Sequence, residues 1–181
     1  MRKTILTYGL ISGGIAALLM LITALYVHDK ENFSGGVYVG YAGIILSFVL
    51  VYFGIKSYRD KYRSGVISFG KAFQVGILIA FISSLIYVIA WMSYSPYLMP
   101  DFPQKYAKAQ IENAKEAGKS EAEVAQIEKE MQNYLESVEN PLIYGLMTFA
   151  EPFPVGLIIT LISALLLKRK TQMSTMDQVQ H

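Results

Sequence analysis

The chain has 181 residues, of which 53% are hydrophobic and 17% are charged, whereas about 25% of the residues in soluble domains are charged. The net charge of +2 gives no argument for nucleic-acid binding, and the absence of cysteine excludes disulfides, thiol catalysis and thiolate metal sites. The charges gather in short clusters separated by long apolar runs, a distribution that leaves no evenly charged surface. The composition therefore predicts an integral membrane protein.

Four apolar runs are long enough to cross a bilayer, and we place the spans at residues 5–27, 37–55, 70–94 and 141–167. About 20 helical residues cross the hydrocarbon core, and only a helix satisfies its own backbone there. The first run is longer than the apolar part of a signal peptide, which favours an uncleaved helix. We predict an all-α fold, a single four-transmembrane-helix bundle over residues 1–170, followed by a disordered cytoplasmic tail at 171–181.

Basic residues alternate between rich and poor connections, as four crossings require. Ten of the 16 lie on one side, whereas the connection between the first two spans holds only Lys30. Because lysine and arginine accumulate in cytoplasmic segments, we predict that both termini are cytoplasmic. Aromatic side chains cluster near the expected outer interface, and we interpret them as membrane anchors in preference to a ligand box: Tyr26, Tyr38, Trp91, Tyr94 and Tyr97.

Residues 97–140 form the only long polar segment, with nine acidic residues and five lysines. Asp101 and Gln104 can cap one helix, Gly118 can end it, and Ser120 with Glu123 forms a capping box for a second. These signals predict an extracytoplasmic helical hairpin between the third and fourth spans.

The second hairpin helix carries an apolar stripe at helical spacing, formed by Val124, Ile127, Met131, Tyr134 and Val138. Two interpretations stay open. The stripe is buried against the first hairpin helix or the bundle rim, or it binds a protein partner.

Small residues recur four apart in every span, as at Gly9 and Gly13, and at Gly156 and Thr160. Small residues at this spacing let helix backbones approach closely. They predict a tight bundle or a contact between copies of the chain in a homo-oligomer.

Glu151 is the one charged residue in the interior of an apolar run, and Pro152 and Pro154 come soon after it. An acid at that depth usually faces the bundle interior or water. The prolines are expected to kink the helix and free carbonyl groups near Thr148 or Ala150. Glu151 either takes a structural role, bonding to a hydroxyl such as that of Thr23 or Tyr87, or serves a transport path.

Four basic residues at the cytoplasmic ends of the second and third spans form a candidate contact for anionic lipid: Arg59, Lys61, Arg63 and Lys71. We interpret them first as residues that set the orientation of the chain in the membrane. Ser68, in the same connection, can cap the third span.

Two stretches carry a resemblance to a known family: Ser68-Phe-Gly-Lys-Ala-Phe73, and Met147-Thr-Phe-Ala-Glu-Pro-Phe-Pro-Val-Gly156 with Asn140-Pro-Leu before it. With the acidic hairpin between them, they resemble the bacterial membrane family catalogued as domain of unknown function 4199. The resemblance implies a four-span protein of the bacterial inner membrane and supplies no activity or ligand.

The residues indicate no catalytic group, no metal site and no cofactor, because neither histidine has a metal-ligand neighbour at useful spacing and no acid pair occupies a span. We predict a non-enzymatic protein with a structural or regulatory role through protein or lipid contacts. The alternative is a small transporter or channel component that uses Glu151.

Overall fold

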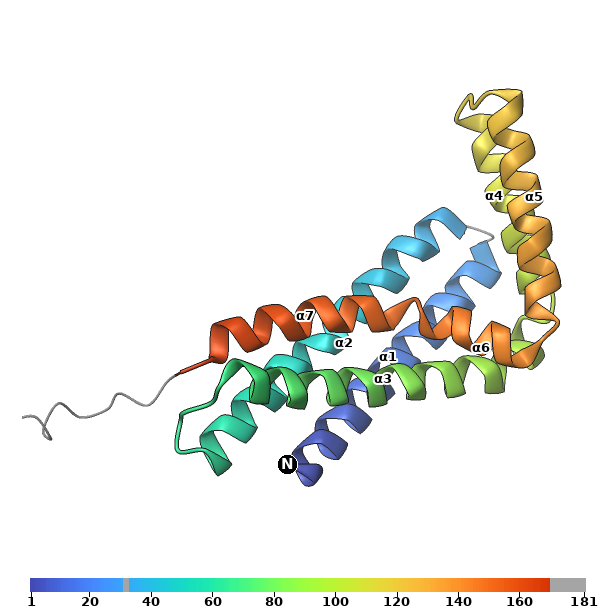
Figure 1. Ribbon diagram of the computed structural model, residues 1–181. Coiled ribbons are helices and arrows are strands. Elements are labelled where there is room, and N and C mark those ends of the chain that lie inside the picture. The colour runs from blue at the N-terminus through green and yellow to red at the C-terminus, as the bar shows by residue number, and fades with distance from the viewer. Residues whose placement is uncertain (31–32, 170–181) are drawn as a thin grey trace, which may run out of the picture.

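The computed structural model describes residues 1–30 and 33–169, which form seven helices (Figure 1). The bundle contains α1 (Arg2–Lys30), α2 (Phe33–Tyr62), α3 (Phe69–Leu98), α6 (Pro141–Phe149) and α7 (Pro152–Leu167). The hairpin contains α4 (Phe102–Glu116) and α5 (Glu121–Val138). The predicted all-α fold is confirmed, whereas the predicted tail at 171–181 lies outside the described residues.

Four segments are long and apolar enough to cross a membrane: Arg2–Val27, Tyr38–Tyr62, Phe69–Leu98 and Pro141–Leu167. This chain is therefore a multi-pass membrane protein. The helices α2 and α3 extend beyond the predicted spans, which ended at residues 55 and 94. The polar residues of α2 beyond the predicted span include Lys56, Arg59 and Lys61, and lysine and arginine favour helix as strongly as most apolar residues do.

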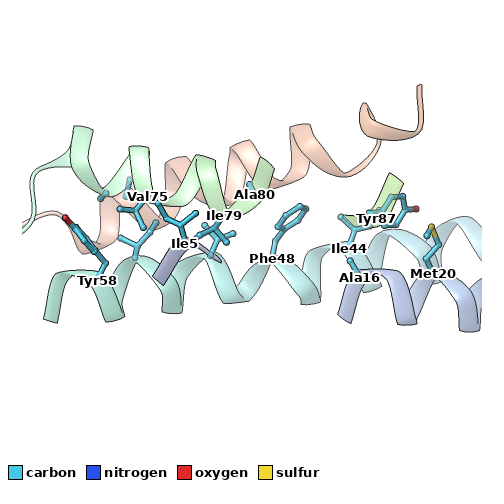
Figure 2. Packing of buried hydrophobic residues seen from close by; sticks show 14 of the residues in the cluster. Ile5, Ala16, Met20, Ile44, Phe48, Tyr58, Val75, Ile79, Ala80 and Tyr87 are labelled. Carbon is cyan, nitrogen blue, oxygen red and sulfur yellow. The ribbon is translucent and has the colours of Figure 1, made fainter. Parts of the chain in front are cut away.

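Helix α3 is central in the bundle and packs against α1, α2 and α7. Figure 2 shows side chains from α1, α2 and α3 filling the interior, with Ile5, Phe48 and Ile79 among them. Phe48 and Ile79 are almost fully buried. Lipid gives helices no hydrophobic reason to associate, so close packing must hold this bundle together.

Glycines allow that close packing between α3 and α7. A Cβ atom on Gly76 would lie 2.7 Å from Cγ2 of Thr160, and one on Gly156 would lie 2.9 Å from Cβ of Ala80. Both distances are too short for any larger residue without a shift of the neighbouring helix. The predicted role of the small residues in a tight bundle is confirmed at this interface.

The hairpin projects past the bundle from the end at which α3 finishes and α6 begins (Figure 1). Gly118 ends α4 with a φ of +69°, and the capping box between Ser120 and Glu123 starts α5, as predicted. The predicted Asp101 cap is wrong: its side chain caps no backbone N–H, and it pairs with Nζ of Lys105 at 3.0 Å instead.

The apolar stripe of α5 is half-buried along its length, and α4 and α5 lie side by side (Figure 1). Ala107 and Ala114 are the buried residues of α4. Small side chains on one helix let the longer apolar side chains of the other reach its backbone. The two hairpin helices therefore bury much of the stripe against each other.

Candidate functional site: a cavity beneath the hairpin

The fourth crossing is broken into two helices at Glu151. Helix α6 ends at Phe149 and α7 begins at Pro152, a residue that donates no backbone hydrogen bond. The predicted span at 141–167 is thus two helices, of about 13 Å and about 24 Å at 1.5 Å per residue. The Thr148 carbonyl is not freed as predicted, because it accepts the N–H of Glu151 at 3.4 Å in a tighter turn.

Glu151 accepts a hydrogen bond from a tyrosine on the facing helix. The hydroxyl of Tyr87 on α3 lies 3.3 Å from Oε2 of Glu151. Of the two hydroxyls considered from the sequence, Tyr87 makes the contact, whereas Thr23 donates to the Leu19 carbonyl within α1. Tyr87 is buried and Glu151 is exposed, so the tyrosine holds the carboxylate at the edge of an open space.

That space is a cavity of about 730 Å³ between the bundle and the base of the hairpin. Its walls come from α1, α2, α3, α4, α5 and α6, so it forms only when the hairpin docks on the bundle. Most of its lining is apolar or aromatic. Glu130 and Glu151 are the charged residues among the described lining residues.

A connected set of aromatic rings forms one wall of the cavity. Trp91 on α3 lies edge-on to Phe102, with ring centroids 5.0 Å apart, and its indole N–H donates to the Tyr144 hydroxyl at 2.8 Å. Tyr106 on α4 contacts Tyr134 on α5, with centroids 5.5 Å apart. We call these five residues the aromatic column. It joins α3, both hairpin helices and α6.

The prediction that Trp91 belongs to a peripheral anchor belt is wrong, because this residue is only 7% exposed. Tyr38 and Tyr97 are 79% and 86% exposed, as anchors would be. Single-sequence patterns could not separate these cases, since Trp91 meets Tyr144 and Phe102 only after two distant helices dock. Tyr106 and Tyr144 were therefore missed as cavity residues, and Tyr134 was noticed only as part of a stripe.

The tyrosines on the hairpin side of the cavity stay neutral. Burial raises the pKa of both Tyr106 and Tyr134, and the nearby negative charge of Glu151 raises each further. A phenol that keeps its proton retains a donor hydroxyl and an electron-rich ring face. The cavity thus combines neutral aromatic faces with carboxylates.

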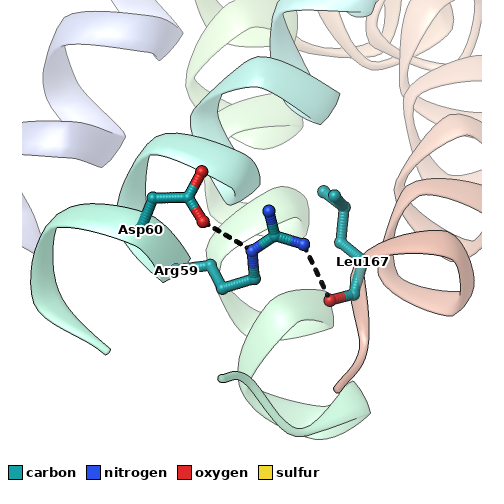
Figure 3. Close-up of polar contacts among 3 residues, drawn as sticks. All are labelled: Arg59, Asp60 and Leu167. Carbon is teal, nitrogen blue, oxygen red and sulfur yellow. Dashed lines mark hydrogen bonds and ion pairs between the residues drawn. The ribbon is translucent and has the colours of Figure 1, made fainter. Parts of the chain in front are cut away.

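The four candidate lipid-contact residues lie at the opposite end of the bundle, and one of them, Arg59, is buried. Figure 3 shows Arg59 turned inward, its Nε 2.7 Å from Oδ1 of Asp60 and its Nη1 3.5 Å from the Leu167 carbonyl. Lys71 donates to Gln74 at 2.8 Å, and the N–H of Lys71 reaches the hydroxyl of Ser68, the predicted cap. Lys61 and Arg63 are exposed. Arg59 therefore ties α2 to the end of α7.

No group of three histidine, aspartate or glutamate side chains within the described ranges comes together as a metal site. The candidate site is the cavity, with Glu151 at the broken helix and the aromatic column beside it.

The model of the family described as a protein of unknown function, DUF4199, matches residues 7–169. The chain belongs to the DUF4199 family. No curated protein and no solved structure matches it. The resemblance drawn from the two sequence stretches is confirmed by this match, which covers the bundle, the hairpin and the cavity.

Proposed function

We propose that this DUF4199 protein is a non-catalytic regulatory protein of the bacterial inner membrane, which acts by holding its hairpin as a contact arm outside the cytoplasm. The orientation is supported by nine described basic residues at the end opposite the hairpin, where Lys61 and Arg63 are exposed and can meet anionic lipid headgroups.

The observation that carries this proposal is a projecting, charged hairpin that is attached to the bundle at its base. The aromatic column fixes its base to α3 and α6, and Nζ of Lys115 on α4 lies 3.1 Å from Glu128 on α5. The outer face stays charged and exposed, as at Lys108 and Glu112. A hairpin that projects past the bundle covers little of it, so its outer face is available to a partner.

The packing of the bundle in the half away from the hairpin also favours a protein-contact role over a transport role. Residues from α2 and α3 fill its centre and are at most 1% exposed: Phe48, Val51, Ile55, Val75 and Ile79. The cavity does not include these residues. A path for ions or solutes through the bundle would require this packed half to open.

The orientation is tested by labelling single cysteines, since the natural chain has none. Lys129→Cys places a thiol on the exposed face of α5, and Lys61→Cys places one at the basic end. We expect a membrane-impermeant maleimide to label Lys129→Cys on intact spheroplasts, and Lys61→Cys only after lysis. The reverse pattern would invert the proposed topology.

The contact role is tested by photocrosslinking in the organism that encodes the chain. A photoreactive amino acid at Lys108 or Glu112 samples the outer face of α4, and one at Leu166 samples an exposed, lipid-facing position of α7. We expect discrete protein adducts from the hairpin positions and none from Leu166. Adducts that are equally frequent at all three positions would contradict a specific hairpin contact.

A transporter that uses Glu151 is the second candidate, favoured by an acid beside a broken helix in a cavity. Proton and sodium flux into proteoliposomes separates the two. The contact role predicts flux equal to that of empty vesicles, whereas flux that disappears in Glu151→Gln would establish the transporter.

A further inference from the structure

The cavity beneath the hairpin is lined by two carboxyl groups and, among its described lining residues, by no basic side chain. The two carboxyl groups belong to Glu151 and Glu130. The described ion pairs include none to Glu151, whose hydrogen bond comes from the neutral Tyr87 hydroxyl. A carboxylate at membrane depth is costly unless a cation or water meets it, so this site favours a positively charged occupant.

The aromatic column supplies a second feature that selects cations. Trp91, Tyr106, Tyr134 and Tyr144 all line the same cavity as Glu151. The faces of such rings attract an ammonium group, by about 0.5–2 kcal/mol per contact, and tryptophan is the strongest. Anions are repelled both by the carboxylates and by the ring faces.

The size and lining of the cavity argue for an organic cation and against a bare metal ion. A volume of about 730 Å³ lies within the range of small-molecule sites, which is roughly 300–1,000 Å³. A calcium or magnesium ion takes about six or more oxygen ligands, and the described residues converge in no such group. The apolar lining, including Met20 and Ile44, suits a hydrocarbon body instead.

We propose that the cavity is a binding site for an organic ammonium cation with an apolar body. Glu151 supplies the countercharge, and Tyr87 positions its carboxylate. Trp91 and the tyrosines of the aromatic column enclose the ammonium group. The site uses the inner face of the hairpin base, so it is separate from the outer face proposed for a protein partner.

An ammonium group of this kind can come from a soluble amine or from the ethanolamine headgroup of a phospholipid. Both would present the same charge to Glu151. The two sources differ in how they respond to the lipid that surrounds the protein.

Trp91 is the single tryptophan of the chain and lines the cavity, so its fluorescence reports occupancy directly. We would titrate the full chain, in nanodiscs of phosphatidylglycerol, with benzyltrimethylammonium. Benzyl alcohol serves as the uncharged aromatic control and benzenesulfonate as the anionic one. We expect a saturable change in Trp91 emission with the cation and none with the anion.

Glu151→Gln removes the charge and keeps the shape of the side chain. We expect it to weaken binding of the quaternary cation by about tenfold, because the charge–charge attraction between the carboxylate and the ammonium group is lost. Glu136→Gln is the matched control, because Glu136 is exposed on α5 and does not line the cavity. It should bind as the unaltered chain does.

The lipid source is tested by repeating the titration in nanodiscs with a fixed fraction of phosphatidylglycerol, in which the remaining lipid is either phosphatidylethanolamine or an uncharged glycolipid without an ammonium group, so that the surface charge is the same. Competition that weakens the apparent affinity for benzyltrimethylammonium assigns the natural occupant to the lipid headgroup. An unchanged affinity assigns it to a soluble amine.

The proposal is overturned if Trp91 emission does not respond to the cation, if Glu151→Gln binds it as tightly as Glu136→Gln does, or if benzyl alcohol binds equally well. Should Glu151→Gln fail to fold, the comparison of the three probes on the unaltered chain still decides. Hairpin crosslinking is unaffected by any of these outcomes, so the contact role stands or falls separately.

Discussion

The two halves of this bundle are built from similar residues and differ in how they fill space. Toward the end at which Arg59 meets Leu167, glycines bring α3 and α7 close together and large side chains such as Phe48 leave no room. Toward the hairpin, Gly40 has nothing within 4 Å of its Cβ position, and the helices spread around a cavity. Small residues therefore do not by themselves make a tight interface. The residues that face a glycine determine whether the two helices touch or leave a cavity there.

The largest expected effect on stability comes from overpacking the interface between α3 and α7. Gly156→Ala places a Cβ 2.9 Å from the rigid Cβ of Ala80, so α3 or α7 must shift. We expect a loss of about 1–3 kcal/mol in the free energy of unfolding, the usual cost of overpacking. Thermal unfolding in detergent measures it. Gly40→Ala is the matched control and should keep or raise the midpoint, because the new methyl group meets open space and alanine favours helix. Equal midpoints for the two variants would refute the contrast between the halves.

A smaller effect is expected in the aromatic column. Tyr144→Phe removes the acceptor of the Trp91 indole N–H and leaves that buried donor unpaired. The expected cost is about 1 kcal/mol, the low end for an unpaired donor because Trp91 also lines the cavity, with a shift in Trp91 emission. Tyr94→Phe is the control, because the buried Tyr94 hydroxyl has no hydrogen-bond partner. If Tyr94→Phe destabilises the chain as much, the indole bond is not what joins α6 to α3.

The hairpin should respond only locally. Ser120→Ala removes the cap of α5, and such caps contribute about 1 kcal/mol. Hydrogen exchange should speed up in the first turn of α5, while the bundle is unchanged. Exchange that rises equally through α3 would show that the hairpin and bundle unfold together.

The same cap predicts that the stability of the first turn of α5 depends on pH. Hydrogen bonds from Ser120 lower the pKa of Glu123. A carboxyl whose pKa is lower when folded stabilises the helix above its unfolded pKa, and that contribution is lost as the pH falls through the folded pKa. Protection of the first α5 turn should therefore fall on acidification, and Ser120→Ala should reduce this dependence. If protection changes with pH equally in the unaltered chain and in Ser120→Ala, the hydrogen bonds of Ser120 are not the cause of the pH dependence.

The smallest effect is expected at Thr160, whose buried hydroxyl has no hydrogen-bond partner. Thr160→Val keeps the shape and removes an unpaired polar group, so the midpoint of unfolding should stay the same or rise slightly. A clear loss of stability would indicate that the hydroxyl has a partner, such as a bound water.

Much of the fold could be predicted from the sequence because its signals are local. Apolar runs, the φ requirement at Gly118 and the capping residues Ser68 and Ser120 each act within a few positions of the chain. The Asp101 cap failed because Lys105, one turn along, is a stronger partner for its carboxylate.

The candidate site was predictable only in part. Glu151 with Pro152 stood out as a charge and a backbone break in one apolar run. The contact with Tyr87 could be named only as one of two hydroxyls. The cavity depends on six helices meeting, and no spacing along the chain encodes where Tyr106 and Tyr144 meet Trp91. The inward orientation of Arg59 likewise could not be predicted from the sequence, since its partner carbonyl lies 108 residues away.

Because of the break at Glu151, the two helices of the last crossing have different packing partners. Helix α7 packs on α2 and α3, whereas α6 packs on α3 and on α5. The tighter turn at Glu151 and the missing N–H of Pro152 interrupt the α-helical hydrogen bonding between α6 and α7, so the two helices are held more by their separate neighbours than by each other. The crossing should then open in two steps, with α6 exchanging its amide protons as part of the hairpin unit and α7 as part of the slower bundle unit.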